Sequence, residues 1–263
     1  MSATATPTAP RPRIRRISVD DVYESLHAGW LDFRAAPKFG LFFGGIYALG
    51  GMMIFFELMR IDQQLWIIPL AFAFPLIGPF VAIGLYEVSR RREAGLPLDW
   101  AEVLGSVWRQ RNGQIPSMAF IVLAGFMVWM WFARLILAIF LGRMRFAVYS
   151  DIDILFTTPN GVAMLVFGTL VGGAIAFVLF AITAVSLPML LDREIDFVTA
   201  MVTSFKAVTL NLRPMLSWAW VIGAATVAAM APFFLGLMVV LPVLGHATWH
   251  LYRRVIAPEG APG

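Results

Sequence analysis

The chain contains no cysteine, which excludes disulfides, thiolate metal sites and cysteine nucleophiles. Histidine is scarce too. The three present are too few to bind the two haems and the copper centre of a haem–copper oxidase, so this class of enzyme is excluded. The sequence also lacks a Walker loop, a dinucleotide-binding glycine pattern after a strand, and a serine elbow. These absences remove the familiar catalytic signatures, and we expect a protein that is not an enzyme and carries no cofactor or metal.

Charged residues make up only 14% of the sequence, whereas 60% of it is hydrophobic and the mean hydropathy is +0.79. A soluble domain usually has about 25% charged residues and about 45–50% apolar ones. The composition therefore predicts an all-α integral membrane protein, a bundle of membrane-spanning helices. Long apolar stretches occur at residues 41–59, 66–88, 117–141, 161–191 and 215–251.

The last of these stretches is almost twice as long as the roughly 20 residues that a helix needs to cross the bilayer. We divide it near Ala231 and Pro232, which gives six spans; one long bent helix, and five spans in total, is the alternative. The stretch 161–191 has no turn signal before Pro188, so we expect a single tilted helix there.

An amphipathic helix precedes each pair of spans, and the three resulting units resemble one another. The units begin at Asp21, Asp99 and Asp196, and nine positions later stand Trp30, Trp108 and Phe205. A proline follows at nearly the same offset, as Pro37, Pro116 and Pro214. The pattern predicts three parallel repeats, at about 18–95, 96–192 and 193–256, related by rotation about the membrane normal.

The starts and the apolar faces of these amphipathic helices carry further predictions. Ser18 with Asp21, and Asp99 with Glu102, have the spacing of capping boxes. We expect the helices to lie in the inner headgroup layer, and packing against the cytoplasmic ends of neighbouring spans is the alternative. In the first case the interfacial anchors are Trp30, Trp108 and Phe205.

The basic residues are divided unequally between the two sides of the membrane. With the amino terminus inside, sixteen of the twenty fall on the cytoplasmic side, Arg60, Arg143 and Arg145 fall outside, and Arg134 lies within a span. The positive-inside rule then places both termini in the cytoplasm. The net charge of +4 is explained by this asymmetry and by anionic lipids, so no nucleic-acid partner is required. Residues 1–17 and 257–263 are expected to be tails of a single membrane domain, 18–256.

Two charged residues fall within the predicted spans, where ionisable groups are costly and often functional. Glu57 and Arg134 both lie near the outer ends of their spans, at similar depth, and we predict that they pair. The alternative is that Arg134 extends to the outer interface by itself. If the two residues pair, replacing both by leucine should be less harmful than the sum of the single changes.

The cytoplasmic ends of the spans hold the other candidate residues. His246 and His250 are four residues apart, hence on one helical face near the inner end of the last span. An interfacial aromatic cluster with Trp249 and Tyr252 is favoured over a metal site, because the spacing fixes no carboxylate nearby. The remaining candidates on this face are His27, Glu87, Arg90 and Arg91.

Three segments resemble a bacterial family of predicted integral membrane proteins labelled domain of unknown function 2189. They are AGWLDFRAAP at 28–37, FPLIGPFVAIGLYEVSRRREAG at 74–95 and LPVLGHATWHLY at 241–252, and the resemblance covers about residues 14–256. It implies a multi-pass protein of the bacterial inner membrane and supplies no catalytic residues.

The function expected from these features is a non-enzymatic accessory or membrane-organising role, with a basic cytoplasmic face that binds anionic lipids or a membrane-protein partner. The alternative is a small-solute or lipid transporter or channel. A transporter needs polar groups around a central cavity, and the predicted spans offer few of them.

Overall fold

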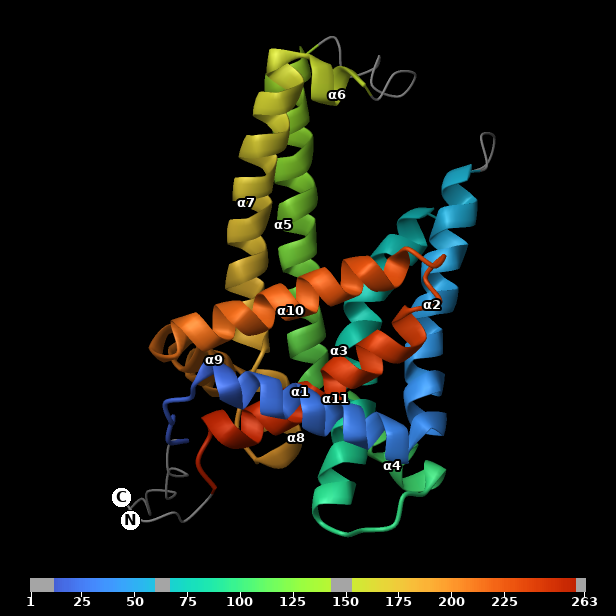
Figure 1. The fold of residues 1–263 in the computed structure, drawn as a ribbon, viewed down its shortest axis with the longest axis vertical. Coiled ribbons are helices and arrows are strands. Elements are labelled where there is room, and N and C mark those ends of the chain that lie inside the picture. Colours follow the sequence, from blue (N-terminus) through green and yellow to red (C-terminus); the bar gives the residue numbers. More distant parts are fainter. Residues whose placement is uncertain (1–11, 60–66, 143–152, 259–263) are drawn as a thin grey trace, which may run out of the picture.

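The computed structural model describes residues 12–59, 67–142 and 153–258, and these residues form helices without any β-sheet. Figure 1 shows the pair α5 and α7 rising from the rest of the molecule, with α2 and α3 as a second pair beside it. The helices are α1 Val19–Ala35, α2 Pro37–Met59, α3 Ile67–Glu93, α4 Trp100–Arg109, α5 Ile115–Leu141, α6 Ile154–Thr157, α7 Pro159–Thr183, α8 Ser186–Asp192, α9 Phe197–Leu210, α10 Leu212–Met230 and α11 Leu237–Val255, with a 3₁₀ turn at Gln110–Asn112.

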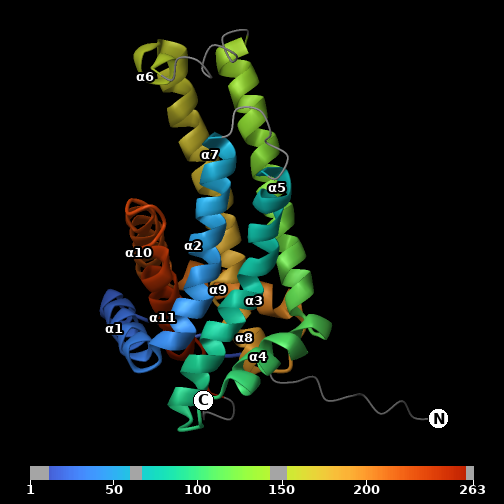
Figure 2. The same ribbon diagram turned by 90° about the vertical axis from the view of Figure 1, so that its right-hand side faces the viewer.

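Helices α1, α10 and α11 slope across the two pairs (Figure 1). Figure 2 shows that these three helices lie together on one side of the molecule. A short helix precedes each helical pair, as α1 before α2 and α3, α4 before α5 and α7, and α9 before α10 and α11. The order of elements is the one expected, while the rotational relation between the three units stays a prediction.

The three short helices begin close to the predicted acidic residues. Ser18 and Asp21 form the predicted capping box at the start of α1, and the Asp196 side chain caps α9 by accepting from the Thr199 amide. The second predicted capping box is wrong, because Asp99 makes no side-chain cap bond. The carboxylate of Glu102 instead accepts a hydrogen bond from Arg91, at 3.1 Å.

The stretch 161–191 is not one continuous helix, which corrects the prediction. Helix α7 ends at Thr183, and α8 begins at Ser186. The Ser204 hydroxyl of α9 enters this break, where it accepts from the Val185 amide at 3.1 Å and donates to the Ala181 carbonyl at 2.7 Å. Pro188 has no amide hydrogen for the carbonyl four residues earlier, so a helix through the break would lose that bond as well.

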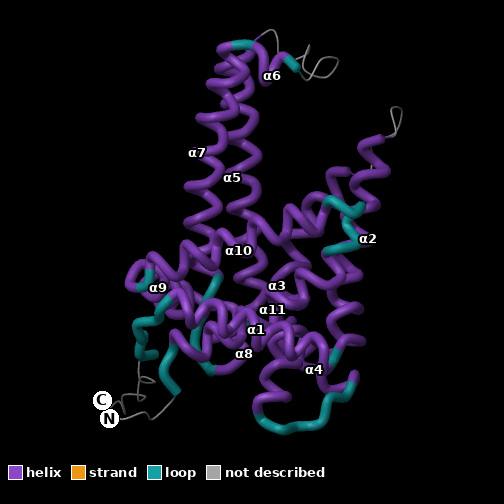
Figure 3. The backbone as a smooth tube through the Cα atoms, viewed as in Figure 1, coloured by secondary structure: helices purple, strands orange, loops and turns teal. Residues whose placement is uncertain are grey.

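Four helical segments among the described residues are long and apolar enough to cross a membrane: α2, α5, α7 with α8, and α10. The predicted division of the last apolar stretch is confirmed, since α10 ends at Met230 and α11 begins at Leu237 (Figure 3). The predicted total of six spans goes beyond these four segments and stays a prediction.

The main hydrophobic core lies at the end of the molecule that carries the termini. Its largest fully buried side chains include Trp218 of α10 with Trp249 and Tyr252 of α11. By contrast, only 6% of the most apolar part of α5, and of the α7–α8 segment, is buried inside the chain. The α5–α7 pair is therefore held to the rest of the molecule mainly at its base, and most of its apolar surface faces outward.

Helix α1 lies against α11 along its length, and the two backbones approach closely. A Cβ atom added at Gly29 would stand 2.5 Å from the Ala247 amide nitrogen and 2.7 Å from the Val243 carbonyl oxygen. Glycine therefore permits this contact, since any side chain would collide with backbone atoms of α11. Part of the apolar face of α1, including Val22 and Phe33, is buried in the bundle.

The two described ends of the chain meet. Ile14 and Ile256 form an antiparallel bridge, flanked by hydrogen bonds from the Arg15 amide to Val255 and from the Ala257 amide to Arg13. Residues 12–17 and Ala257 had been assigned to tails, and the structure instead places them in hydrogen bonds. Residues 1–11 and 259–263 lie outside the described part. Both described ends consequently lie on one side of the molecule, as the predicted topology requires.

Candidate functional site

A group of buried and half-buried polar residues joins α1, α3 and α11. Its members are Asp32 of α1, Ser89 and Arg92 of α3, and His246 and His250 of α11. The Ser89 Oγ lies 2.8 Å from His246 Nδ1, and His250 Nε2 lies 2.8 Å from Asp32 Oδ2. Arg92 donates a hydrogen bond to the other oxygen of Asp32. We call this group the inner polar cluster.

Asp32 is the centre of the cluster, and only 8% of its side chain is exposed. Burial by itself raises the pKa of this carboxyl group, because a charge is less stable away from water. Hydrogen bonds with His250 and Ser89, and the nearby histidine charges, act in the opposite direction and hold the pKa below its usual value of 3.8. Asp32 is therefore a carboxylate at neutral pH.

Two further groups of charged residues border the cluster. Glu87 is buried on α3 and accepts two hydrogen bonds from Arg90, at 2.7 and 2.9 Å, while Arg91 lies 3.3 Å from the same carboxylate. Glu93 accepts from the Trp249 indole at 3.0 Å and from Arg253 at 3.0 Å. The contacts of Glu93 tie the basic end of α3 to α11, and Arg91 ties it to Glu102 of α4.

The comparisons with known proteins concern the centre of the chain. Residues 67–192 match the model of a family described as predicted integral membrane protein, DUF2189. This region is similar to the DUF2189 family. The resemblance predicted from the sequence is thereby confirmed for residues 67–192, and the protein is an integral membrane protein with several helices able to span the bilayer. No curated protein and no solved structure matches the chain.

The DUF2189 region begins at α3 and ends with α8, so it supplies Ser89 and Arg92 to the inner polar cluster. Asp32, His246 and His250 come from helices outside the matched residues. The cluster is consequently the place where the DUF2189 region is attached to the amino-terminal and carboxy-terminal helices.

The structure brings together most of the predicted cytoplasmic-face candidates. His246, His250, Glu87, Arg90 and Arg91 all lie at the contact of α3 with α11 or beside it. His27 is exposed on α1, away from the buried face of that helix. Within the described residues, no group of three or more histidine and carboxylate side chains could hold a metal ion.

The interfacial position of the aromatic cluster expected beside the histidines stays a prediction. Trp249 and Tyr252 are in contact, with ring centres 5.6 Å apart, but both are almost completely buried. The Tyr252 hydroxyl donates to Asp192 at 2.6 Å. Trp249 is bonded to Glu93 at the end of α3 and Tyr252 to Asp192 of α8, and both rings belong to the main hydrophobic core.

The predicted pair of Glu57 and Arg134 is not observed, since no ion pair in the described part of the chain joins them. Arg134 is exposed on α5, whereas Glu57 lies near the end of α2. The two helices are not among the extensively contacting pairs. The two side chains thus have separate surroundings.

The three predicted interfacial anchors all present their rings at the surface. The exposed fractions are 41% for Trp30, 65% for Trp108 and 44% for Phe205. An exposed cation accompanies each ring: Arg34 is one turn from Trp30, the Arg111 guanidinium lies 4.1 Å from the Trp108 ring centre, and Lys206 follows Phe205. We call these three pairs the surface ring–cation pairs.

The geometry of the inner polar cluster favours attachment over catalysis. Ser89 and His246 have no exposed surface, so this hydroxyl–imidazole pair lacks an open side for a substrate. Asp32 and Ser89 were not predicted as site residues from the sequence. One signal was present, since Val22, Ser25, Gly29 and Asp32 recur at helical spacing and mark a small and polar buried face on α1.

Proposed function

We propose that the protein is a non-enzymatic accessory or membrane-organising protein of the bacterial inner membrane, whose cytoplasmic face binds anionic lipids. The observation that carries the proposal is the set of surface ring–cation pairs on α1, α4 and α9. Aromatic rings favour the headgroup level of a bilayer, and neighbouring cations attract anionic headgroups.

The packing of the three helices supports the same function. Each helix buries one face in the bundle, for example Val103 and Ser106 of α4 and Ala207 and Val208 of α9. The exposed rings therefore stand on helices whose position is fixed by the bundle. A surface of this kind holds lipid headgroups at defined places around the protein, which is what an organising role requires.

The test measures how the full-length protein, reconstituted in vesicles, associates with spin-labelled phosphatidylglycerol and phosphatidylcholine. We expect a preference for phosphatidylglycerol that falls as salt rises, since each basic residue contributes roughly 1 kcal/mol over about a 10 Å screening length. The variant with Arg34→Gln, Arg111→Gln and Lys206→Gln should lose most of this preference. Arg16→Gln, an exposed basic residue outside the three pairs, is the control. Equal association of both lipids with the unmodified protein would contradict the proposal.

A further inference from the structure

Two cavities lie along the α5–α7 pair, well away from the inner polar cluster. One has a volume of about 580 Å³ and is lined only by α5 and α7, from Trp129 to Leu137 and from Met164 to Gly173. The other has a volume of about 550 Å³ and extends to Tyr47 of α2 and Pro75 of α3. Both are lined by Trp129 and Gly172, so the two cavities adjoin at these residues, and we call them together the groove.

Glycine creates the groove. Gly172 lies against the Trp129 ring, because an added Cβ would stand 2.9 Å from it. At Gly173 no atom lies within 4 Å of an added Cβ, and at Gly168 the first contact is at 3.9 Å. The missing side chains leave a depression whose wall is almost wholly apolar. Volumes of this size are typical of sites that hold small molecules.

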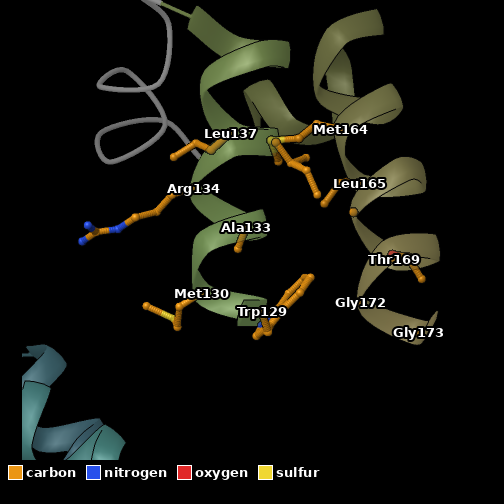
Figure 4. A pocket seen from close by; sticks show the side chains of 12 residues that line it. Trp129, Met130, Ala133, Arg134, Leu137, Met164, Leu165, Thr169, Gly172 and Gly173 are labelled. Carbon is orange, nitrogen blue, oxygen red and sulfur yellow. The ribbon is translucent and has the colours of Figure 1, made fainter. Parts of the chain in front are cut away.

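Among the residues that the structure describes, Arg134 is the only charged one that lines the groove. It lies seven residues before Leu141, hence about 10 Å along the axis from the described end of α5. In Figure 4 its side chain leaves α5 on the side away from α7, at the rim of the groove. No ion pair in the described part of the chain includes it. A cation at this depth in a membrane is stabilised by an anion that reaches it.

We propose that this groove binds a phospholipid of net negative charge. One acyl chain lies along Gly168, Gly172 and Gly173, against the Trp129 ring, and the phosphate accepts hydrogen bonds from Arg134. A planar guanidinium matches two phosphate oxygens, which explains an arginine rather than a neutral residue at the rim. The inference does not rest on the proposed function, because the groove and the ring–cation pairs are on different helices.

The test uses Trp129 as a local reporter in the full-length protein. Brominated acyl chains quench nearby tryptophan, and the Trp129 signal is the difference between the unmodified protein and Trp129→Phe. In mixed vesicles we expect brominated phosphatidylglycerol to quench Trp129 about five-fold more effectively than brominated phosphatidylcholine. This factor corresponds to the roughly 1 kcal/mol by which one basic residue near the surface attracts an anionic lipid. Arg134→Gln should remove this preference while both lipids still quench.

Gly173→Leu places its Cβ where no atom lies within 4 Å, so the added side chain occupies the groove and should reduce quenching by both lipids. Gly223→Leu on α10 is the matched control, because its Cβ also meets no atom within 4 Å and it lies outside the groove. Equal quenching by the two lipids in the unmodified protein would overturn the proposal. A second result would also overturn it: neither lipid quenches Trp129, and the protein cross-links as a dimer. A second copy of the chain would then cover the groove. Either result leaves the salt-dependent association at α1, α4 and α9 untouched.

Discussion

Asp32 makes the most consequential single contact, because one carboxylate joins α1 to both α3 and α11. The partners of Asp32 could not be predicted from the sequence, because Arg92 and His250 are 60 and 218 positions away from it. Helical spacing identifies the buried face of α1, but only the packing of three helices decides which polar groups meet there.

We predict that Asp32→Asn lowers the stability of the protein by about 2 kcal/mol at neutral pH, because hydrogen bonds to charged groups contribute about 1.5–3 kcal/mol. The folded pKa of Asp32 is depressed, so its contribution is present above about pH 4 and is lost as the pH falls through the folded value. Thermal unfolding in detergent at pH 7 and pH 3 measures this. The exposed Asp20→Asn on the same helix is the control. A deficit of equal size at both pH values would contradict the prediction.

Gly29 permits the contact of α1 with α11, and alanine there should be destabilising. The added Cβ meets backbone atoms, which cannot rotate away, and overpacking of this kind costs about 1–3 kcal/mol. Gly223→Ala is the matched control, because its Cβ enters open space and alanine favours the helix by about 0.5–1 kcal/mol. The melting temperature in detergent is the measurement. Similar changes at both positions would show that α1 is not closely attached to α11.

At the scale of elements, local signals predicted the helix starts well. Pro37, Pro116 and Pro214 lie in the first turns of α2, α5 and α10, where the missing amide hydrogen costs nothing. The break between α7 and α8 was not predicted, because it depends on Ser204, which is 19 residues from Val185. Apolar composition indicates a membrane helix, but it does not show where a side chain from another helix interrupts it.

We predict that Ser204→Ala destabilises the protein by about 1–3 kcal/mol, since it leaves the Val185 amide and the Ala181 carbonyl without their partner in a buried place. Thr209→Ala on the same helix is the control, because that exposed hydroxyl bonds only to carbonyls of its own helix. Chemical unfolding monitored by tryptophan fluorescence compares the two. If both variants behave alike, Ser204 does not hold the break between α7 and α8.

For the whole molecule, the sequence predicted an all-helical membrane protein, its helical pairs and the position of both ends on one side. It did not predict how far each pair extends. The α10–α11 turn has no charged residue, and its Phe233 and Phe234 have positive φ angles of 54° and 65°. Phe233 lies against Phe55 of α2, with ring centres 5.1 Å apart. Such contacts depend on the slope of α10 and α11, which hydropathy does not encode.

The final prediction concerns the depth of this turn. An added Cβ on Gly51 would stand 2.6 Å from Phe234, and Gly51 lies about 12 Å below the described end of α2 at Met59. The turn therefore stops short of the outer end of α2. Because the chain has no cysteine, Asn160→Cys and Pro232→Cys provide unique sites for a membrane-impermeant maleimide. In intact cells we expect labelling of the first, beyond the far end of α5, and not of the second, whose site lies within the apolar layer. Labelling of both would mean that α10 crosses completely, as six full spans require.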